Sequence, residues 1–151
     1  MNEKECQQQH LEFIQNIITR MNTNSFQIKE LTILIITACL AIYASEKINL
    51  MLLIPIIPTL VLWFLDAFYL QQERKFRSLY NDVANINAPK LYNPKPYEMP
   101  ICKYTADKNS SLSFWRAFFS QTILLFYCSL IITLLVLFVI LKIKCISIIF
   151  Q

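Results

Sequence analysis

The side chains best suited to chemistry in this sequence lie in or beside long apolar runs. Asp66 is the one acidic residue inside such a run, and Arg116 opens a later run. An ionised carboxylate is costly in hydrocarbon, so it is paired, hydrated near lipid headgroups, or used to handle ions or protons. We expect an Asp66–Arg116 pair between two spans or interfacial hydration, with ion or proton handling as the alternative.

A set of hydroxyl groups lies in the last apolar run. Thr122, Ser129 and Thr133 are separated by seven and four residues, which places them on one face of a helix. Inside a membrane, such a face bonds to a neighbouring helix or lines a wet path. Both interpretations stay open, because Ser and Thr also bond back to their own helix.

A basic cluster follows the second apolar run, formed by Arg74, Lys75 and Arg77. On a helix that leaves the membrane, these residues make a solvated face that contacts lipid headgroups. The alternative is a surface on which a partner docks.

No combination of residues indicates catalysis. His10 is the single histidine, and the five cysteines form no C-x-x-C pair. The chain has no glycine, which excludes the usual forms of phosphate-binding loops, dinucleotide fingerprints and nucleophile elbows. We therefore predict no catalytic residue, no cofactor, no metal site and no enzyme activity.

The composition is that of a membrane protein. The 151 residues are 56% hydrophobic and only 16% charged, against about 25% charged in a typical soluble domain. The net charge of +4 is spread thinly, without the clustered basic face that nucleic-acid binding needs. We predict an integral membrane protein with a single domain over residues 1–151, whose partner is the lipid membrane and not nucleic acid.

Three apolar runs have about the length needed to cross ~30 Å of hydrocarbon as helices. The predicted spans cover residues 26–45, 50–70 and 112–141, which makes the fold class an all-α membrane protein. A secretory signal is the competing interpretation of the first run, but a long and mostly polar segment precedes it. Pro55 and Pro58 are expected to kink the second span.

Two helices and a tail are expected outside the spans. Residues 1–24 have the apolar spacing of an amphipathic helix, and Asn22–Ser25 interrupts it before Ser25 caps the first span. Residues 71–86 continue the second span as a helix beyond the membrane. After the third span, residues 142–151 form a tail.

Residues 87–111 form a proline-rich loop, with four prolines that disfavour helix and favour extended backbone. The loop is either flexible or a strap draped over the helices, anchored by Leu91, Tyr92, Tyr97 and Ile101. Helix is expected to resume at Ser110 or Ser111, either of which is a good cap.

Lysine and arginine residues set the expected orientation. They are concentrated before the first span and between the second and third, whereas the connector between the first two spans holds only Lys47. The positive-inside rule then places the N-terminus and residues 71–111 in the cytoplasm and the C-terminus outside.

The stretches HLEFIQNIITRMNTNSFQIK and WFLDAFYLQQERKFRSLY resemble a group of small bacterial membrane proteins. The arrangement is also similar to the SLATT class, membrane effectors from bacterial conflict systems, over roughly residues 9–84. That class has a leading helix, a two-span hairpin and a cytosolic helical extension. The resemblance implies a multi-pass protein of the bacterial inner membrane and a signal-gated, membrane-permeabilising effector of antiviral defence.

Two functions stay open. The first is a homo-oligomeric pore or membrane-disrupting effector, which needs several copies because three spans are too few to enclose a channel. The second is a membrane-anchored interaction or scaffold protein that recruits a cytosolic protein partner. A transporter is disfavoured by the absence of internal repeats and of midplane charge.

Overall fold

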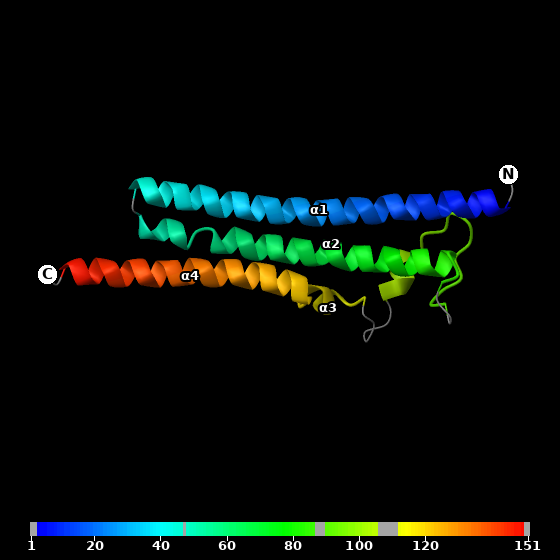
Figure 1. Cartoon of the computed structure of the whole chain (residues 1–151). Coiled ribbons are helices and arrows are strands. Elements are labelled where there is room, and N and C mark those ends of the chain that lie inside the picture. The colour runs from blue at the N-terminus through cyan, green and yellow to red at the C-terminus, as the bar shows by residue number, and fades with distance from the viewer. Residues whose placement is uncertain (1–2, 47, 87–89, 106–111, 150–151) are drawn as a thin grey trace. The chain divides into compact units, whose positions relative to one another are not determined.

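The structure is a computed structural model that describes residues 3–46, 48–86, 90–105 and 112–149. Its helices are α1 (Glu3–Glu46), η1 (Asn49–Leu52), α2 (Ile56–Val83), η2 (Ile101–Thr105), α3 (Phe114–Phe118) and α4 (Gln121–Ile149) (Figure 1). No strand occurs in these ranges. Three helical stretches in them are long and apolar enough to cross a membrane, within residues 4–46, 50–83 and 121–143. The predicted all-α class with three such helices is confirmed.

α1 runs as one helix where the sequence predicted two. The expected interruption at Asn22–Ser25 is absent, and Ser25 is a buried residue inside the helix instead of a cap. Asn, Thr and Ser each cost less than about 0.7 kcal/mol relative to Ala, too little to stop a helix that is packed on both sides. The Thr23 hydroxyl also donates to the carbonyl of Thr19 at 3.0 Å, so it stays satisfied within the helix.

α2 begins later than predicted, because the helix of the second span is interrupted at Pro55. After the short 3-10 helix η1, α2 starts at Ile56, directly after Pro55. Pro58 lies in the first turn, where a backbone N–H would have no intrahelical acceptor, so its ring removes no hydrogen bond. The two prolines therefore lie where the second apolar stretch changes from η1 to α2. At its other end α2 continues to Val83, as the predicted helical extension requires.

The third apolar run is divided between two helices. α3 ends at Phe118 and α4 begins at Gln121, so the expected continuous span is interrupted at Phe119 and Ser120. The N-cap of α3 is Ser113, in extended backbone. The predicted caps Ser110 and Ser111 lie outside the described residues.

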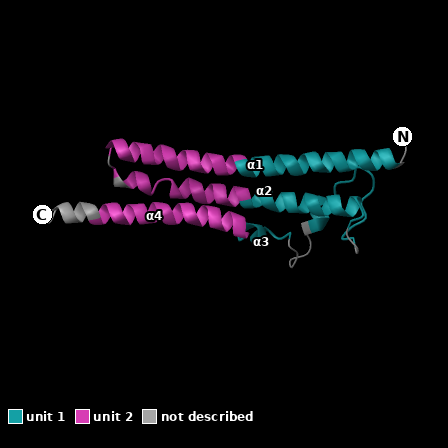
Figure 2. Ribbon diagram, in the orientation of Figure 1, with its two compact units in different colours: residues 1–26, 67–119 teal, residues 27–66, 120–151 magenta. Residues whose placement is uncertain are grey.

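The chain forms two compact units, shown in Figure 2. Unit 1 comprises residues 1–26 and 67–119, and unit 2 comprises residues 27–66 and 120–151. α1 and α2 each contribute residues to both units.

Unit 1 has its own hydrophobic core. The buried cluster joins α1, α2, η2 and the segment before α3 through Ile14, Ile18, Leu79, Tyr104 and Leu112. The residues 90–105, which we call the strap, pack against this core through Tyr92 and Ile101. The other two predicted anchors, Leu91 and Tyr97, have exposed side chains. The loop is therefore a strap over the helices: Tyr92 and Ile101 pack against the core, and the partly exposed Tyr97 ring contacts Phe13 on α1 at a centroid distance of 6.3 Å, whereas Leu91 is exposed.

Unit 2 consists of the later part of α1, the first part of α2, and α4, which lie side by side in Figure 2. Its buried positions are few, and its outer surface is covered by large apolar side chains, among them Leu34, Ile57, Leu60, Val61, Phe64, Leu125, Ile132, Val136 and Val139. Apolar surface of this extent is unfavourable in water and matches hydrocarbon, in which helices satisfy their own backbone groups.

The end of α2 turns without glycine. Asn85 has φ 59°. The N–H of Ile86 donates to the carbonyl of Asn81 at 3.0 Å, and that of Asn85 to the carbonyl of Asp82 at 3.4 Å. This pair of bonds is the Schellman motif, whose left-handed position favours Gly and, next, Asn.

Tyr97 takes a positive φ of 62° in the strap, which is unusual for a bulky residue. It follows Pro96 in a turn closed by the N–H of Glu98 donating to the carbonyl of Lys95 at 3.0 Å. The Tyr97 hydroxyl donates to Gln9 on α1 at 2.7 Å, which offsets part of the backbone cost.

Asn85 offers a matched test of this glycine-free turn. Asn85→Ala is expected to lower the unfolding free energy by about 1 kcal/mol, because a Cβ without a local hydrogen bond disfavours left-handed backbone. Asn85→Gly should leave stability unchanged or raise it. Thermal unfolding of both variants in detergent, followed by helical circular dichroism, makes the comparison, and equal losses would contradict the turn described here.

Candidate functional site

The polar centre of unit 2 is an ion pair between α1 and α2. Lys29 Nζ lies 2.7 Å from Asp66 Oδ2, and the Asp66 side chain is fully buried whereas 25% of the Lys29 side chain is exposed. On α1 the buried residues Ile28, Thr32 and Ile36 recur at helical spacing, and Lys29 flanks this stripe. The stripe turns toward α2, so the long lysine side chain reaches the carboxylate while its stem stays partly outside.

Side chains from all three helices of unit 2 surround the Asp66 carboxylate. The Tyr127 side chain, from α4, is fully buried, and its hydroxyl lies near Asp66 and Thr32 without an aligned hydrogen bond among the described residues. The Tyr127 ring stacks on Trp63 with ring centroids 5.8 Å apart and planes 2° from parallel. Thr32 donates its hydroxyl hydrogen to the carbonyl of Ile28 at 2.8 Å. The carboxylate is thus enclosed by polar and aromatic groups, away from hydrocarbon.

The partner of Asp66 differs from the one expected. The sequence named Arg116, but the structure pairs Asp66 with Lys29. Arg116 belongs to unit 1, where its backbone carbonyl accepts a hydrogen bond from Arg74 at 3.3 Å. Lys29 lies near the start of the first predicted span and Asp66 near the end of the second. Because consecutive spans run antiparallel, the start of the first span and the end of the second lie at the same depth in the membrane. The Lys29–Asp66 pair could therefore have been predicted from the sequence.

The hydroxyl face of α4 lies away from this centre. Thr122, Ser129 and Thr133 are all exposed, whereas α4 packs into unit 2 through Ile123, Tyr127 and Leu134. Ser129 donates to the carbonyl of Phe126 at 2.8 Å, and Thr133 to that of Ser129 at 2.7 Å. In a single copy, the hydroxyls therefore bond to their own helix and face outward from unit 2.

The basic cluster after the second apolar run does not form one uniform face. Arg74 donates to the carbonyl of Arg116, Lys75 is buried, and Arg77 is exposed and lies 2.6 Å from Glu73. Of the three predicted headgroup or partner contacts, Arg77 is the one most open to the surroundings.

A buried carboxylate that the sequence did not single out holds the strap. Asp82, in the last turn of α2, accepts hydrogen bonds from the N–H of Leu91 at 3.3 Å, the N–H of Tyr92 at 3.0 Å and the hydroxyl of Tyr104 at 2.8 Å. Burial, then the bond to Asp82, raises the pKa of Tyr104. A negative charge is unfavourable near the C-terminus of a helix, where the helix dipole is negative. An aspartate at that position therefore indicates that hydrogen-bond donors from outside the helix stabilise it.

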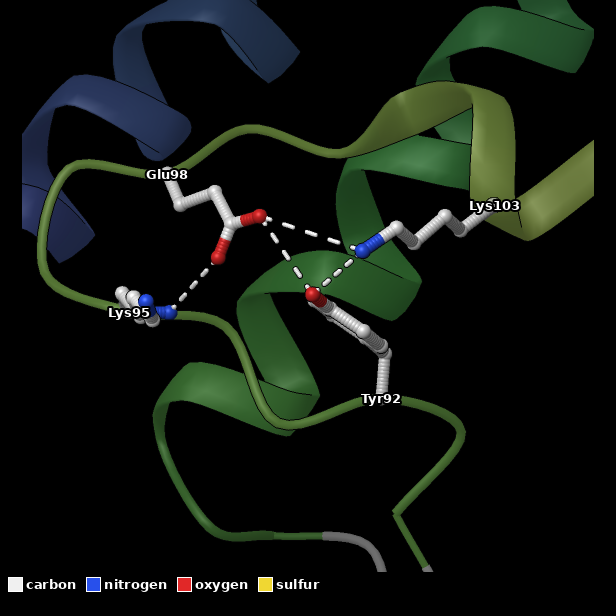
Figure 3. A network of polar contacts seen from close by, with 4 residues as sticks. All are labelled: Tyr92, Lys95, Glu98 and Lys103. Atoms are coloured by element: carbon white, nitrogen blue, oxygen red, sulfur yellow. Dashed lines mark hydrogen bonds and ion pairs between the residues drawn. The ribbon is translucent and has the colours of Figure 1, made fainter.

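An exposed network lies farther along the strap (Figure 3). The Glu98 carboxylate accepts bonds from the N–H of Lys95 at 3.0 Å and the hydroxyl of Tyr92 at 3.3 Å, and Lys103 donates to that hydroxyl. The N–H of Lys95 is the main cause that lowers the pKa of Glu98, and nearby lysine charges add to it. Because solvent screens exposed charges, this network stabilises the strap much less than Asp82 does.

The described ranges contain no group of three or more His, Cys, Asp or Glu side chains that could hold a metal ion. Cys6, Cys39, Cys102 and Cys128 are free thiols. His10, the single histidine, is a buried residue of unit 1.

The ion pair of unit 2 can be tested by removing one or both charges. Lys29→Met is expected to lower the unfolding free energy by about 3–5 kcal/mol, because it leaves the Asp66 carboxylate buried without a counter-charge. Lys29→Met with Asp66→Leu should recover most of that loss. Thermal unfolding in detergent measures both, with Lys4→Met, exposed on the same helix, as the control. A double variant as unstable as Lys29→Met alone would contradict the pairing.

The strap can be tested through Asp82. Asp82→Asn replaces a charged acceptor of three hydrogen bonds, and each bond to a charged group contributes about 1.5–3 kcal/mol. We expect faster tryptic cleavage after Lys90 on the strap, because the next N–H, that of Leu91, is one of those bonded to Asp82. Glu98→Gln, which changes the exposed network, is the matched control and should leave the cleavage rate nearly unchanged. Equal rates for the two variants would show that Asp82 does not hold the strap.

No family model, no curated protein and no solved structure matches the chain.

Proposed function

We propose that the protein is an oligomeric membrane-permeabilising effector whose copies assemble through α4 around a polar path. The observation that carries this proposal is the exposed hydroxyl face of α4, formed by Thr122, Ser129 and Thr133. The surface around it is apolar, with Leu125, Ile132 and Val136 exposed on the same helix. In a membrane, a hydroxyl face of this kind is used where it meets another helix or water.

The hydrogen bonds of this face suit a subunit that inserts first and assembles afterwards. Ser129 and Thr133 give their hydroxyl hydrogens to their own helix, so neither exposes an unsatisfied donor to lipid. Each hydroxyl oxygen keeps acceptor capacity that water or a neighbouring copy can use. A single copy is thus tolerated in lipid, and an assembly gains a wettable lining.

In this proposal, the ion pair of unit 2 has a structural role. Lys29 and Asp66 compensate each other at 2.7 Å inside one copy. A buried pair of this geometry keeps the two helices in register. The lining of the path is therefore assigned to α4, and ion or proton handling by Asp66 is not needed.

The proposed location in the bacterial inner membrane rests on the distribution of lysine and arginine and on the resemblance to SLATT effectors. By the positive-inside rule, unit 1 faces the cytoplasm and the C-terminus lies outside a bacterial inner membrane. The similarity to SLATT effectors over the leading helix and the first two spans supports a role in antiviral defence.

A second candidate is a membrane-anchored interaction protein that recruits a cytosolic partner. It is favoured by two apolar side chains outside the spans, Ile86 and Leu91, which are 66% and 64% exposed. Leu91 lies on the strap that Asp82 holds on unit 1, and Ile86 follows the end of α2. Exposed apolar groups on ordered backbone are features that a protein partner covers.

Reconstituted vesicles test the permeabilising function. Purified protein in liposomes is expected to release a trapped anionic dye and to appear as an oligomer in nanodiscs. Ser129→Leu with Thr133→Leu should reduce dye release about tenfold, because the lining loses its polar groups. The matched control is Ile132→Leu with Val136→Leu, which changes two exposed apolar positions of the same helix and should leave release unchanged.

The outcomes separate the two candidates. A stable monomer without dye release would remove the pore and leave the anchored interaction protein. Dye release that both double variants reduce equally would show that the hydroxyl groups do not line the path.

A further inference from the structure

Unit 1 contains a cavity of about 550 Å³ between the start of α1, the end of α2 and the strap. These three segments lie together near the N-terminus in Figure 1. The volume falls within the range of about 300–1,000 Å³ found for small-molecule sites. The wall includes polar side chains from each segment: Gln7, His10, Asp82, Asn85, Lys90 and Asn93.

His10 is the unusual member of this wall, because only 2% of its surface is exposed. Nε2 has no hydrogen-bond partner among the described residues, whereas the backbone of Glu98 lies close enough to the ring to favour a proton on it. With that proton on Nδ1, Nε2 of a neutral imidazole is an acceptor. A buried acceptor without a donor is unfavourable, and here it belongs to a residue that lines a cavity.

The wall holds two charged side chains of opposite sign, and the Lys90 ammonium is the accessible one because the Asp82 carboxylate is fully buried. The Asp82 carboxylate already accepts three hydrogen bonds from the strap. Lys90 is exposed, and its Nζ lies 3.3 Å from the neutral side-chain oxygen of Asn93. An ammonium held by an amide keeps its charge available for an anion.

We propose that this cavity binds a small organic anion, a phosphate or carboxylate that also carries a hydroxyl group. The charged end pairs with Lys90 Nζ, and the hydroxyl donates to His10 Nε2. Binding satisfies the buried acceptor and bridges α1 to the strap. The site uses no residue of α4, so it does not depend on the permeabilising function.

The single histidine makes the test direct. The protein, with its histidine carbon-labelled, is placed in phosphatidylcholine nanodiscs, and the imidazole signal of His10 is followed by NMR. The probes are ribose 5-phosphate, glycerol 3-phosphate and citrate, and ribose and glycerol are the uncharged controls. At least one anion is expected to give a saturable shift, and neither uncharged compound should do so.

Two strap lysines provide the matched variants. Lys90→Gln should weaken binding about tenfold, as expected for a lost charge-assisted bond. Lys95→Gln, an exposed lysine outside the cavity wall, should leave binding unchanged. Nanodiscs containing phosphatidylglycerol without added anion test a lipid phosphate as the source, and a shift that Lys90→Gln weakens assigns the site to that headgroup. No saturable shift from any anion or lipid, or equal weakening by both variants, would overturn the proposal.

Discussion

Solvation by hydrocarbon is the constraint on which the rest of this structure depends. Unit 2 buries few residues and exposes large apolar side chains on all of its helices. Such a unit is stable only where the surroundings are apolar and every backbone group is bonded within a helix. The same constraint makes the buried Asp66 carboxylate energetically costly, because lipid offers the carboxylate no water. This cost explains why Lys29, Thr32 and Tyr127 lie around the carboxylate.

The sequence predicted the helices well because apolar length is a strong signal, and their interruptions less well because local signals are weak. Asn22–Ser25 suggested a break, yet α1 continues, since the packing of Ile14 and Ile18 before it and of Ile28 after it outweighs small propensity costs. The effect of the two prolines on the second span was also hard to predict. Their effect depends on whether they fall in the first turn or the interior of a helix, and this could not be known before the start of α2 was known.

The candidate site was predictable in its chemistry but not in its pairings. Asp66 stands out by type and place, whereas its partner follows from the relative depth of two antiparallel helices. Asp82 was overlooked because its donors are backbone N–H groups of the strap, which have no signature in residue types. His10 looked unremarkable for a similar reason. Its burial depends on the strap residue Tyr97, whose ring lies 6.0 Å away across a long stretch of sequence.

The pairing of Lys29 with Asp66 also bears on how the protein is made. An isolated charge costs up to about 2.5–3.5 kcal/mol at the centre of an inserted helix and less near its ends, where Lys29 and Asp66 lie. The first span, with Lys29, is synthesised before the second. Each charge is less costly to insert beside its counterpart, so the pairing favours release of the first two spans into the bilayer together, as a hairpin.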